Sequence, residues 1–545
     1  MNTARARRFL VLALAALAVV ALAACGSSKK SSSGSASADP AAIMPAGTTI
    51  YVEANVNPSA NQKSAFDQLA QNAFGISDPG QKIVAALDKS AAKDGTTFEK
   101  DIKPWLGDKV AIGITRLGRN ANSSDYAAVI DTTDPKQAMD TLKKNKPNLK
   151  SGSINGVDYL TDGKIYAGTI DNFLIVGQRA GFAAIAGQKG DKLADQDTFK
   201  QARAKAPADR LGYLYVDFDA FLNYAASTQA SLKSQLGTFK GLFGNLKAIS
   251  ASLVVAPTSL EIDASIVGIN GSKAPSGPSA VPLGKLPGTA WAAASVRNLG
   301  PLLTKELNAL GKIGASNNGQ DFGQILARLK AATGIDIEQD FLSWVGDTGA
   351  FVEGTTANDL GGAVIIQSTD PAKSQAAIGK ISGLLTALGR TATKISVQGG
   401  TGIEIATTTN GPKVDLAAVG SKFYIAFGPT ALKDAMSPGT TLDSNANYNA
   451  AVKSLKGTEP KLYLNLQTVL AFADQFAGNS ASYQMIKPYL DRFTSLIAGY
   501  SDGVAKIVVN VKPNGGPITT TPSTAPPTAT VASDSSDSGS YFPGG

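Results

Sequence analysis

FEKDIKPWLGD, residues 98–108, is matched by IEQDFLSWVGD, residues 337–347, at a constant offset of 239 positions (98 against 337). Two of the three tryptophans lie in these two stretches. Apolar residues fall at i, i+4, i+7 and i+8, which is typical of one helix face. Each stretch therefore predicts a short helix, then Gly107 or Gly346 as a left-handed helix stop, then a strand.

Five positions are identical in the two copies of this motif. They are Glu99 and Glu338, Asp101 and Asp340, Trp105 and Trp344, Gly107 and Gly346, and Asp108 and Asp347. Large aromatic side chains contribute strongly to cores, so we expect each tryptophan to fill the core of its own repeat. Two sharper hypotheses remain open. The tryptophan and its acids form a ligand platform, or the paired acids act as acid and base in glycan cleavage.

Further markers recur in the same order on either side of the motif. They are Pro45-Ala46-Gly47-Thr48 and Pro287-Gly288-Thr289, Asp134-Pro135 and Asp370-Pro371, and Leu214-Tyr215-Val216-Asp217 and Leu462-Tyr463-Leu464-Asn465. Strand candidates within each repeat often follow one another through short turns. This order predicts an α+β fold of two tandem homologous domains, each an antiparallel-rich sheet covered on one face by helices.

The N-terminus has the pattern of an export signal. Arg5, Arg7 and Arg8 precede an uncharged apolar run, residues 9–22, which is short for a membrane span. The run ends in Leu22-Ala23-Ala24-Cys25, which resembles a bacterial lipobox. The resemblance implies cleavage before Cys25 and attachment of diacylglycerol to its sulfur. The expected location is then the outer face of the bacterial cell membrane.

Composition sets the remaining boundaries along the chain. The predicted segments are 1–24 signal peptide, 25–42 lipidated cysteine and flexible tether, 43–267 first repeat, 268–285 Pro/Gly linker, 286–512 second repeat, and 513–545 tail. The tether is rich in serine, glycine and alanine, the linker in glycine, serine and proline, and the tail in proline, threonine, serine and glycine. Such segments bury too little apolar surface to fold, so we expect the tether and the tail to be disordered.

The residue types exclude several chemistries. The chain has no histidine and one cysteine, Cys25, which the lipobox assigns to the anchor. Ser-His-Asp catalysis, imidazole zinc sites and disulfides are therefore excluded. We expect no catalytic residue, no metal and no cofactor. Removal of Arg5, Arg7 and Arg8 lowers the formal charge from +8 to +5, and no dense basic stripe predicts binding to nucleic acid.

The chain resembles a family of exported bacterial, mainly actinobacterial, proteins catalogued as a domain of unknown function. The resemblance rests on the lipobox at Cys25, on Pro45-Ala46-Gly47-Thr48 with Tyr51-Val52-Glu53, and on Pro104-Trp105-Leu106-Gly107-Asp108. It spans roughly residues 43–512. The second repeat departs from the motif at Ser343 and Val345. The resemblance implies a location and an architecture, and it carries no reaction.

The leading hypothesis is a non-enzymatic, lipid-anchored envelope protein that binds or scaffolds at the membrane. Its partners would be the membrane itself, an envelope protein, a cell-wall polymer or a lipid. A second hypothesis is a carrier of lipid or another apolar ligand, with a pocket lined by residues such as Tyr51, Phe173 and Leu214. A solute-binding protein of a transporter and a carboxylate-dependent hydrolase are two further hypotheses.

The predicted anchor can be tested by a Cys25→Ala substitution. The full chain, expressed in a bacterial host, is expected in the membrane fraction, and the variant is expected in the soluble fraction because the lipid attachment point is gone. A variant that stays with the membranes as completely as the parent chain would contradict the predicted anchor.

Overall fold

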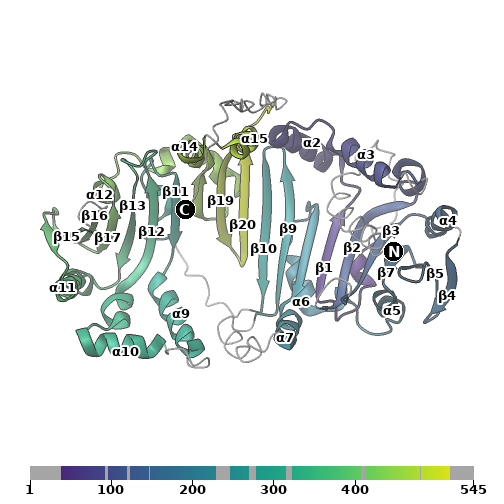
Figure 1. Ribbon diagram of the computed structural model, residues 1–545, viewed down its shortest axis with the longest axis horizontal. Helices are drawn as coiled ribbons and strands as arrows, with labels where there is room; N and C mark the ends of the chain where they lie inside the picture. The colour runs from purple at the N-terminus through teal and green to yellow at the C-terminus, as the bar shows by residue number, and fades with distance from the viewer. Residues whose placement is uncertain are drawn as a thin grey trace, which may run out of the picture.

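A computed structural model describes residues 38–91, 96–118, 123–146, 148–228, 246–268, 278–314, 322–406, 413–478 and 480–515. These residues form helices and a single 20-stranded sheet, in which every strand pairing is antiparallel (Figure 1). The structure therefore confirms the α+β class. The predicted signal peptide and Cys25 lie outside the described residues, as does the chain beyond residue 515.

Ten strands come from each half of the chain. Those of the first half are β1 (Ile50–Asn55), β2 (Leu106–Arg116), β3 (Asp125–Thr132), β4 (Lys150–Ile154), β5 (Val157–Thr161), β6 (Tyr166–Ile170), β7 (Phe173–Gly177), β8 (Gly212–Asp217), β9 (Ala248–Ala256) and β10 (Ser259–Val267). Those of the second half are β11 (Ala292–Val296), β12 (Val345–Glu353), β13 (Gly361–Ser368), β14 (Ala392–Ile395), β15 (Gly400–Ala406), β16 (Lys413–Val419), β17 (Lys422–Phe427), β18 (Pro460–Asn465), β19 (Phe493–Ser501) and β20 (Val504–Val511).

The strand order is the same in both halves when it is followed outward from the middle of the sheet. The pairings give the order β4-β5-β6-β7-β3-β2-β1-β8-β9-β10-β20-β19-β18-β11-β12-β13-β17-β16-β15-β14. Adding ten to a strand number in the first half gives its counterpart in the second. The last strand of each half meets the other at the centre.

The halves share one sheet, where the sequence predicted two. The reason is the pairing of β10 with β20, which runs from Ser259 opposite Asn510 to Ser265 opposite Val504. Each of these strands would otherwise be an edge with unpaired backbone groups. The pairing satisfies both edges at once, so the sheet continues through the boundary between the halves.

Helices lie on both faces of the sheet and along both ends of its strands. They are α2 (Ala60–Phe74), α3 (Pro79–Ala91), α4 (Pro135–Asn145), α5 (Arg179–Ala186), α6 (Asp197–Ala204), α7 (Phe218–Thr228), α9 (Leu299–Gly314), α10 (Phe322–Thr333), α11 (Pro371–Ala387), α12 (Ala431–Met436), α13 (Ala446–Ser454), α14 (Leu466–Ala477) and α15 (Ala481–Leu490). We call the face packed by α5, α6, α12 and α13 the covered face, and the other the open face.

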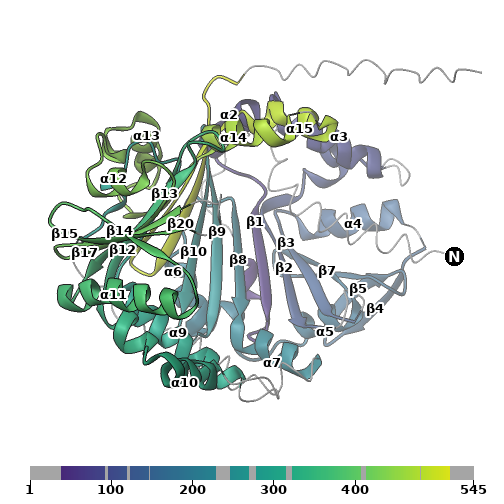
Figure 2. The same cartoon turned by 60° about the vertical axis from the view of Figure 1, so that its left-hand side comes forward.

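Helices cover the open face in three described places. α4 packs on it near one far end of the sheet, α11 packs on it near the other, and α2 packs on Val255 and Leu260 at the ends of β9 and β10. This differs from the prediction of helices on one face alone. Figures 1 and 2 show α2, α3, α14 and α15 at one end of the strands, with α7, α9 and α10 at the opposite end. The helices therefore frame the central strands of the open face and leave the middle of these strands uncovered.

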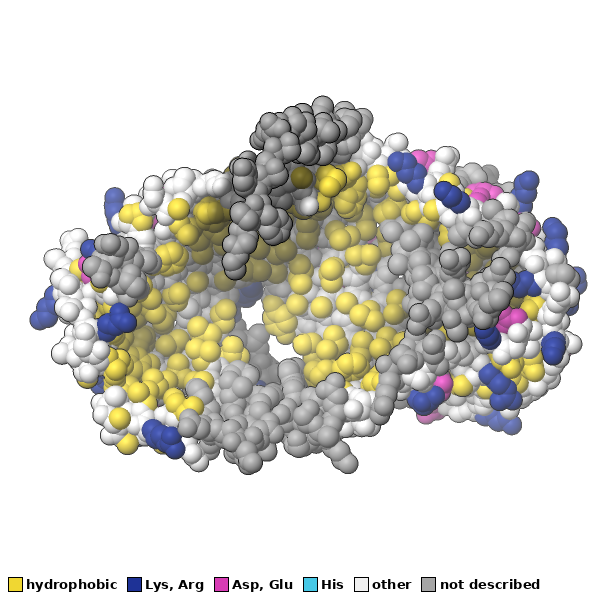
Figure 3. All heavy atoms as spheres, in the orientation of Figure 1, with side chains coloured by type: hydrophobic (Ala, Val, Ile, Leu, Met, Phe, Trp, Pro, Cys, Tyr) yellow, Lys and Arg dark blue, Asp and Glu magenta, His cyan; other side chains and the backbone are white. Residues whose placement is uncertain are grey.

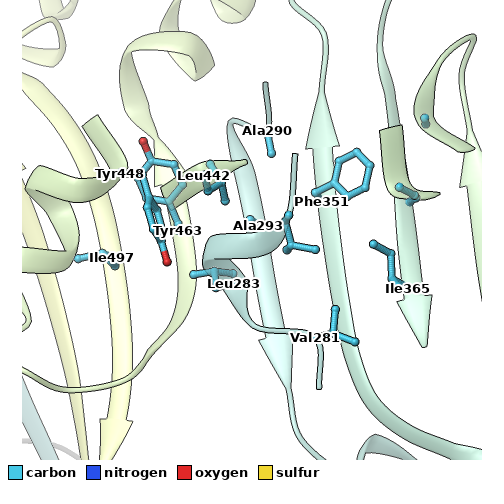
Figure 4. Packing of buried hydrophobic residues seen from close by; sticks show 14 of the residues in the cluster. Val281, Leu283, Ala290, Ala293, Phe351, Ile365, Leu442, Tyr448, Tyr463 and Ile497 are labelled. Atoms are coloured by element: carbon cyan, nitrogen blue, oxygen red, sulfur yellow. The ribbon is translucent and has the colours of Figure 1, made fainter. Parts of the chain in front are cut away.

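The main cores lie between the sheet and the helices of the covered face. In the second half, Phe351, Tyr448, Tyr463 and Ile497 pack together with residues of the segment before β11 (Figure 4). The rings of Tyr448 and Tyr463 meet edge to face, with centroids 5.2 Å apart. The first-half core contains Tyr51, Tyr213 and Tyr215 around the α6 residue Phe199.

Three predicted boundaries differ from the structure, in each case because apolar or polar anchors extend the folded part. Ala41, placed in the tether, is fully buried. Val281 and Leu283, placed in the linker, are buried in the second-half core. Gly515, placed in the tail, donates its backbone N–H to Asn72 Oδ1 at 3.0 Å. Residues 269–277, in the middle of the predicted linker, lie outside the described residues.

Asn72 of α2 ties the two halves together. Its Nδ2 donates to the Pro257 carbonyl at 2.9 Å, and its Oδ1 accepts from Gly515 N. We expect Asn72→Ala to lower the free energy of unfolding by about 2 kcal/mol, because two backbone groups lose their partners. Urea unfolding measures this. Gln68→Ala is the control, since Gln68 bonds the exposed Ser64 hydroxyl. Equal losses in the two variants would contradict the assignment.

Candidate functional site

The central strands present apolar side chains to the outside of the molecule on the open face. Ile262 is 39% exposed and Ile266 45% exposed on β10, and Ile507 is 36% exposed on β20. Val52 of β1 and Leu214 of β8 face each other across their strands and are exposed to a similar degree. Antiparallel sheets with one free face normally present polar residues there. This face is therefore unusual for a sheet surface in water.

One row of directly opposed residues shows how far the apolar surface extends. It crosses nine neighbouring strands, from β9 to β17, and contains Leu253, Ile262, Ile507, Ala498, Leu462, Ala294, Ala350, Val364 and Ile425. Every member is aliphatic. At a strand spacing of about 4.8 Å, the row is roughly 38 Å long. It passes through the joint between β10 and β20 without interruption.

The same central strands carry buried polar residues on the covered face. Ser259, Glu261, Asp263 and Ser265 of β10 are all less than 9% exposed. Lys506 of β20 binds both Glu261 and Asp263, with Nζ 2.9 Å from Asp263 Oδ1. The usual orientation of an amphipathic strand is thus reversed. The polar side is buried against the rest of the protein, and the apolar side faces out.

Figure 3 looks onto the open face in the orientation of Figure 1. Hydrophobic side chains spread over the central strands of both halves, and the surface between the halves is hollowed. Lysine, arginine, aspartate and glutamate lie mainly around the outside of this region. Contiguous exposed apolar surfaces of this kind mark interaction sites in proteins. The open face is therefore the candidate binding site.

The duplicated tryptophan motif lies elsewhere, beside the far strands. Trp105 and Trp344 are buried, and each indole Nε1 donates to the carbonyl of the residue four positions earlier, Asp101 or Asp340, at 2.6 and 2.7 Å. Trp105 packs with Ala138 of α4. Trp344 packs against Phe423 and α11. The two copies therefore fill equivalent places between a strand pair and a helix.

The glycine of the motif has a different role from the predicted helix stop. Gly107 and Gly346 lie within β2 and β12, and neither has a positive φ. A Cβ on Gly107 would lie 2.5 Å from the Asp131 carboxylate, and one on Gly346 would lie 2.6 Å from the Gln367 carbonyl. The prediction of a left-handed stop is wrong. These positions need glycine because a neighbouring strand approaches them closely.

The acids of the motif are engaged in local hydrogen bonds. Asp101 Oδ2 accepts from Thr97 N at 2.8 Å, and Asp340 Oδ2 accepts from Asp336 N at the same distance. Thr97 N–H holds the pKa of Asp101 below its usual range. Asp108 Oδ1 accepts from Asn57 Nδ2 at 2.9 Å. These bonds give each acid a local partner within its own turn or in a neighbouring loop.

Asp347 binds the segment that enters the second half. Its carboxylate accepts from Ala280 N at 2.7 Å and from Asn298 N at 3.0 Å. Among the described residues, no cluster of three or more His, Cys, Asp or Glu side chains is placed to hold a metal ion. The arrangement around the duplicated motif is that of a structural element that packs a helix against the sheet.

The residues suggested to line an interior pocket for an apolar ligand lie on opposite faces of the sheet. Tyr51 and Phe173 are buried in the first-half core, where Tyr51 meets Phe199 edge to face at 5.6 Å. Leu214 lies on the other side of the sheet, on the open face. The expectation that these three residues line one pocket is therefore wrong. Alternation along β8 separates Leu214 from the core to which Tyr213 and Tyr215 belong.

A polar cluster is buried near the end of β1. Glu53 accepts from Tyr51 OH at 2.7 Å and from Arg203 Nη2 at 2.9 and 3.0 Å. Arg210 Nη2 lies 3.6 Å from Glu53 Oε1. Burial alone would raise the pKa of Glu53, but Arg203, Lys109 and the Tyr51 hydroxyl outweigh it, and the pKa is lowered.

A small polar cavity of about 110 Å³ adjoins this cluster and is lined in part by Glu53, Lys109 and Arg210. In the second half, Arg297 follows β11 and binds Glu459 before β18 at 3.1 Å. We therefore interpret the Glu53 cluster as a structural tie.

The residues predicted for lipidation, Leu22, Ala23, Ala24 and Cys25, lie outside the described residues. Within the described part of the chain, no helix is both long and apolar enough to cross a bilayer.

A comparison with protein families decides the relationship. A family model described as a protein of unknown function, DUF3352, matches residues 8–499. The chain belongs to the DUF3352 family. A search of curated proteins gives no match.

Two crystal forms of TP0453 are among the solved structures similar to this DUF3352 protein. Form I is 13% identical and covers 44% of this chain and 81% of its own, with a TM-score of 0.23. Form III is 12% identical and covers 44% of this chain and 83% of its own, with a TM-score of 0.24.

The open face was not predicted from the sequence. The signal is present in β10, where Leu260, Ile262, Ala264 and Ile266 alternate with serine and acidic residues. Alternation shows that one side of a strand is apolar, and the usual rule assigns that side to the core. The largely buried lysine that neutralises the acids of β10, Lys506, lies 245 residues from Glu261. Only the pairing of β10 with β20 reveals the reversal.

Glu53→Gln tests the buried tie and its pH dependence. We expect the free energy of unfolding to fall by roughly 3 kcal/mol, because Arg203 loses its buried partner. A carboxylate with a lowered folded pKa stabilises the protein above its unfolded value, and this stabilisation is lost as pH falls through the folded pKa. The parent chain should therefore lose stability as pH falls below about 4.5, the ordinary glutamate value, more steeply than the variant.

Urea unfolding at several pH values measures both effects. Glu404→Gln is the control, because the Glu404–Lys413 pair is more exposed and should contribute less than about 1 kcal/mol. Equal costs for the two substitutions would refute a structural role for Glu53.

Proposed function

We propose that the protein binds the acyl chains of a lipid on its open face, at the outer side of the cell membrane. The observation that supports this most directly is the aliphatic row on the open face from β9 to β17, in which Ile262, Ile507 and Ile425 are exposed and which passes over the buried charges of β10 and β20. The sequence alone favours a scaffold, with a lipid carrier as the second hypothesis. The exposed sheet surface favours the carrier, now with a surface site in place of an interior pocket.

The chemistry of the row favours hydrocarbon over a protein partner. Protein interfaces are rich in tyrosine, tryptophan and arginine, which supply both area and hydrogen bonds. The nine residues of the row are alanine, valine, isoleucine and leucine, which offer no side-chain hydrogen bond. An acyl chain needs none. Burial of apolar area alone, at about 25 cal/mol per Å², would drive its binding.

The row is also long enough to hold an acyl chain. The row is roughly 38 Å long at a strand spacing of about 4.8 Å. One leaflet of a bilayer contributes about half of its ~30 Å hydrocarbon thickness. The row is therefore longer than one extended acyl chain, so a whole chain can lie on it.

The proposal includes the membrane location and the duplication that the sequence predicts. A diacylglycerol on Cys25 would keep the open face close to its source of lipid. A non-enzymatic role fits the engagement of Asp101, Asp108, Asp340 and Asp347 in local bonds. The common strand order of the halves supports duplication of an ancestral unit, which would have doubled the apolar surface.

The first experiment is native mass spectrometry of the chain from residue 26 onward, purified from a bacterial host, before and after extraction with organic solvent. We expect bound mass that is released as lipid. Binding of a fluorescent fatty acid should then weaken at least tenfold in Ile262→Glu, because a carboxylate would have to be desolvated beneath the ligand.

Leu388→Glu is the matched control, since Leu388 is 68% exposed directly after α11 and does not belong to the row. Ile507→Thr is a second variant that keeps a β-branched residue in the strand. Wild-type protein that binds neither lipid nor fatty acid would refute the proposal, as would open-face variants that bind as tightly as the control. A protein partner that is lost only from the open-face variants would show that this face binds protein and not lipid.

A further inference from the structure

The hairpin formed by α14 and α15 lies at the edge of the open face. α14 begins directly after β18, whose residue Leu464 belongs to that face, and it packs against β19. Its Phe472 stacks on Trp291, with ring centroids 6.5 Å apart. The helices therefore stand on the sheet beside the proposed lipid site.

The hairpin is apolar but has no buried residue in either helix. Phe476 is 70% exposed near the end of α14, and Met485 is 68% exposed on α15. Ile486 and Tyr489 of α15 are also exposed. Met485, Ile486 and Tyr489 have the spacing of neighbours on one helix side. We call Phe476, Met485, Ile486 and Tyr489 the hairpin tip.

The hairpin carries no net charge. α14 contains one ionisable acid, Asp474, and α15 contains one base, Lys487. Their side chains bind each other at 2.9 Å, and Lys487 also binds Asp491 at 3.1 Å. The Tyr483 hydroxyl donates to Asp474 at 2.8 Å. The charged groups of the hairpin therefore pair with one another, and its exposed surface consists of the tip residues beside the uncharged Gln475, Ser482 and Gln484.

We infer that the hairpin tip inserts into the surface of a lipid bilayer. Amphipathic helices with large apolar residues bind the bilayer interface in proportion to the apolar area that they bury. A neutral tip gains nothing from anionic head groups, so its binding should depend on hydrocarbon and not on charge. Insertion would bring the open face to the acyl chains that it binds. This role of the insertion rests on the proposed function.

Vesicle co-sedimentation of the unlipidated chain, residues 26–545, tests the insertion. This chain retains every described residue. We expect it to bind phosphatidylcholine vesicles, with little change when phosphatidylglycerol or high salt is added. The double variant Phe476→Ser/Ile486→Ser should lower the partition coefficient roughly tenfold or more, because two apolar side chains no longer enter hydrocarbon.

Leu388→Ser is the matched control, since Leu388 is as exposed as Met485 but lies after α11. Equal binding by the double variant and the control would overturn the inference. So would binding that requires phosphatidylglycerol and disappears at high salt. A dimer of the parent chain that the double variant dissociates, in sedimentation velocity, would assign the tip to self-association instead.

A label reports insertion directly. Cys25 is the only cysteine, so residues 26–545 contain none. Met485→Cys can then carry a single environment-sensitive dye. Its emission should shift to the blue with vesicles, and that of labelled Leu388→Cys should not. The fatty-acid assay on the double variant separates the two proposals, because unchanged fatty-acid binding with lost vesicle binding means that only insertion depends on the tip.

Discussion

The antiparallel pairing of β10 with β20 is the constraint on which the rest of the structure depends. It joins two ten-strand arrays into one sheet, and it does so beside the buried contacts of Lys506 with Glu261 and Asp263. Taking these charges out of water is costly unless each has a partner. The partners come from opposite halves of the chain, so neither half can bury its polar strand face alone.

The position of the charges also determines the chemistry of the other face. Successive side chains of a strand point to opposite sides. Once Glu261 and Asp263 face the helices, Ile262 and its neighbours must face outward. The apolar surface is thus coupled to the joint: a sheet with the ordinary orientation would bury the isoleucines and lose the ion cluster. α4 and α11 cover this surface only near the far strands, where the two tryptophans lie.

Much of the local structure could be predicted from the sequence. Asp134 and Asp370, each followed by proline as is typical of a helix start, cap α4 and α11, and the tryptophans of both motif copies are buried. The role of Gly107 could not be predicted, because it depends on the approach of Asp131 from β3. The candidate site was missed for a similar reason. Alternation in β10 identifies two sides, whereas the identity of the buried side depends on a lysine in the last strand.

The same joint has a consequence for biosynthesis. Glu261 and Lys506 are 245 residues apart, so the N-terminal array emerges long before its neighbour strand exists. During that interval β10 presents an unpaired edge next to aliphatic side chains, a combination that promotes association between chains. Contacts this distant in sequence also form slowly. A chaperone that holds the nascent polypeptide would therefore act mainly in the time before β20 arrives.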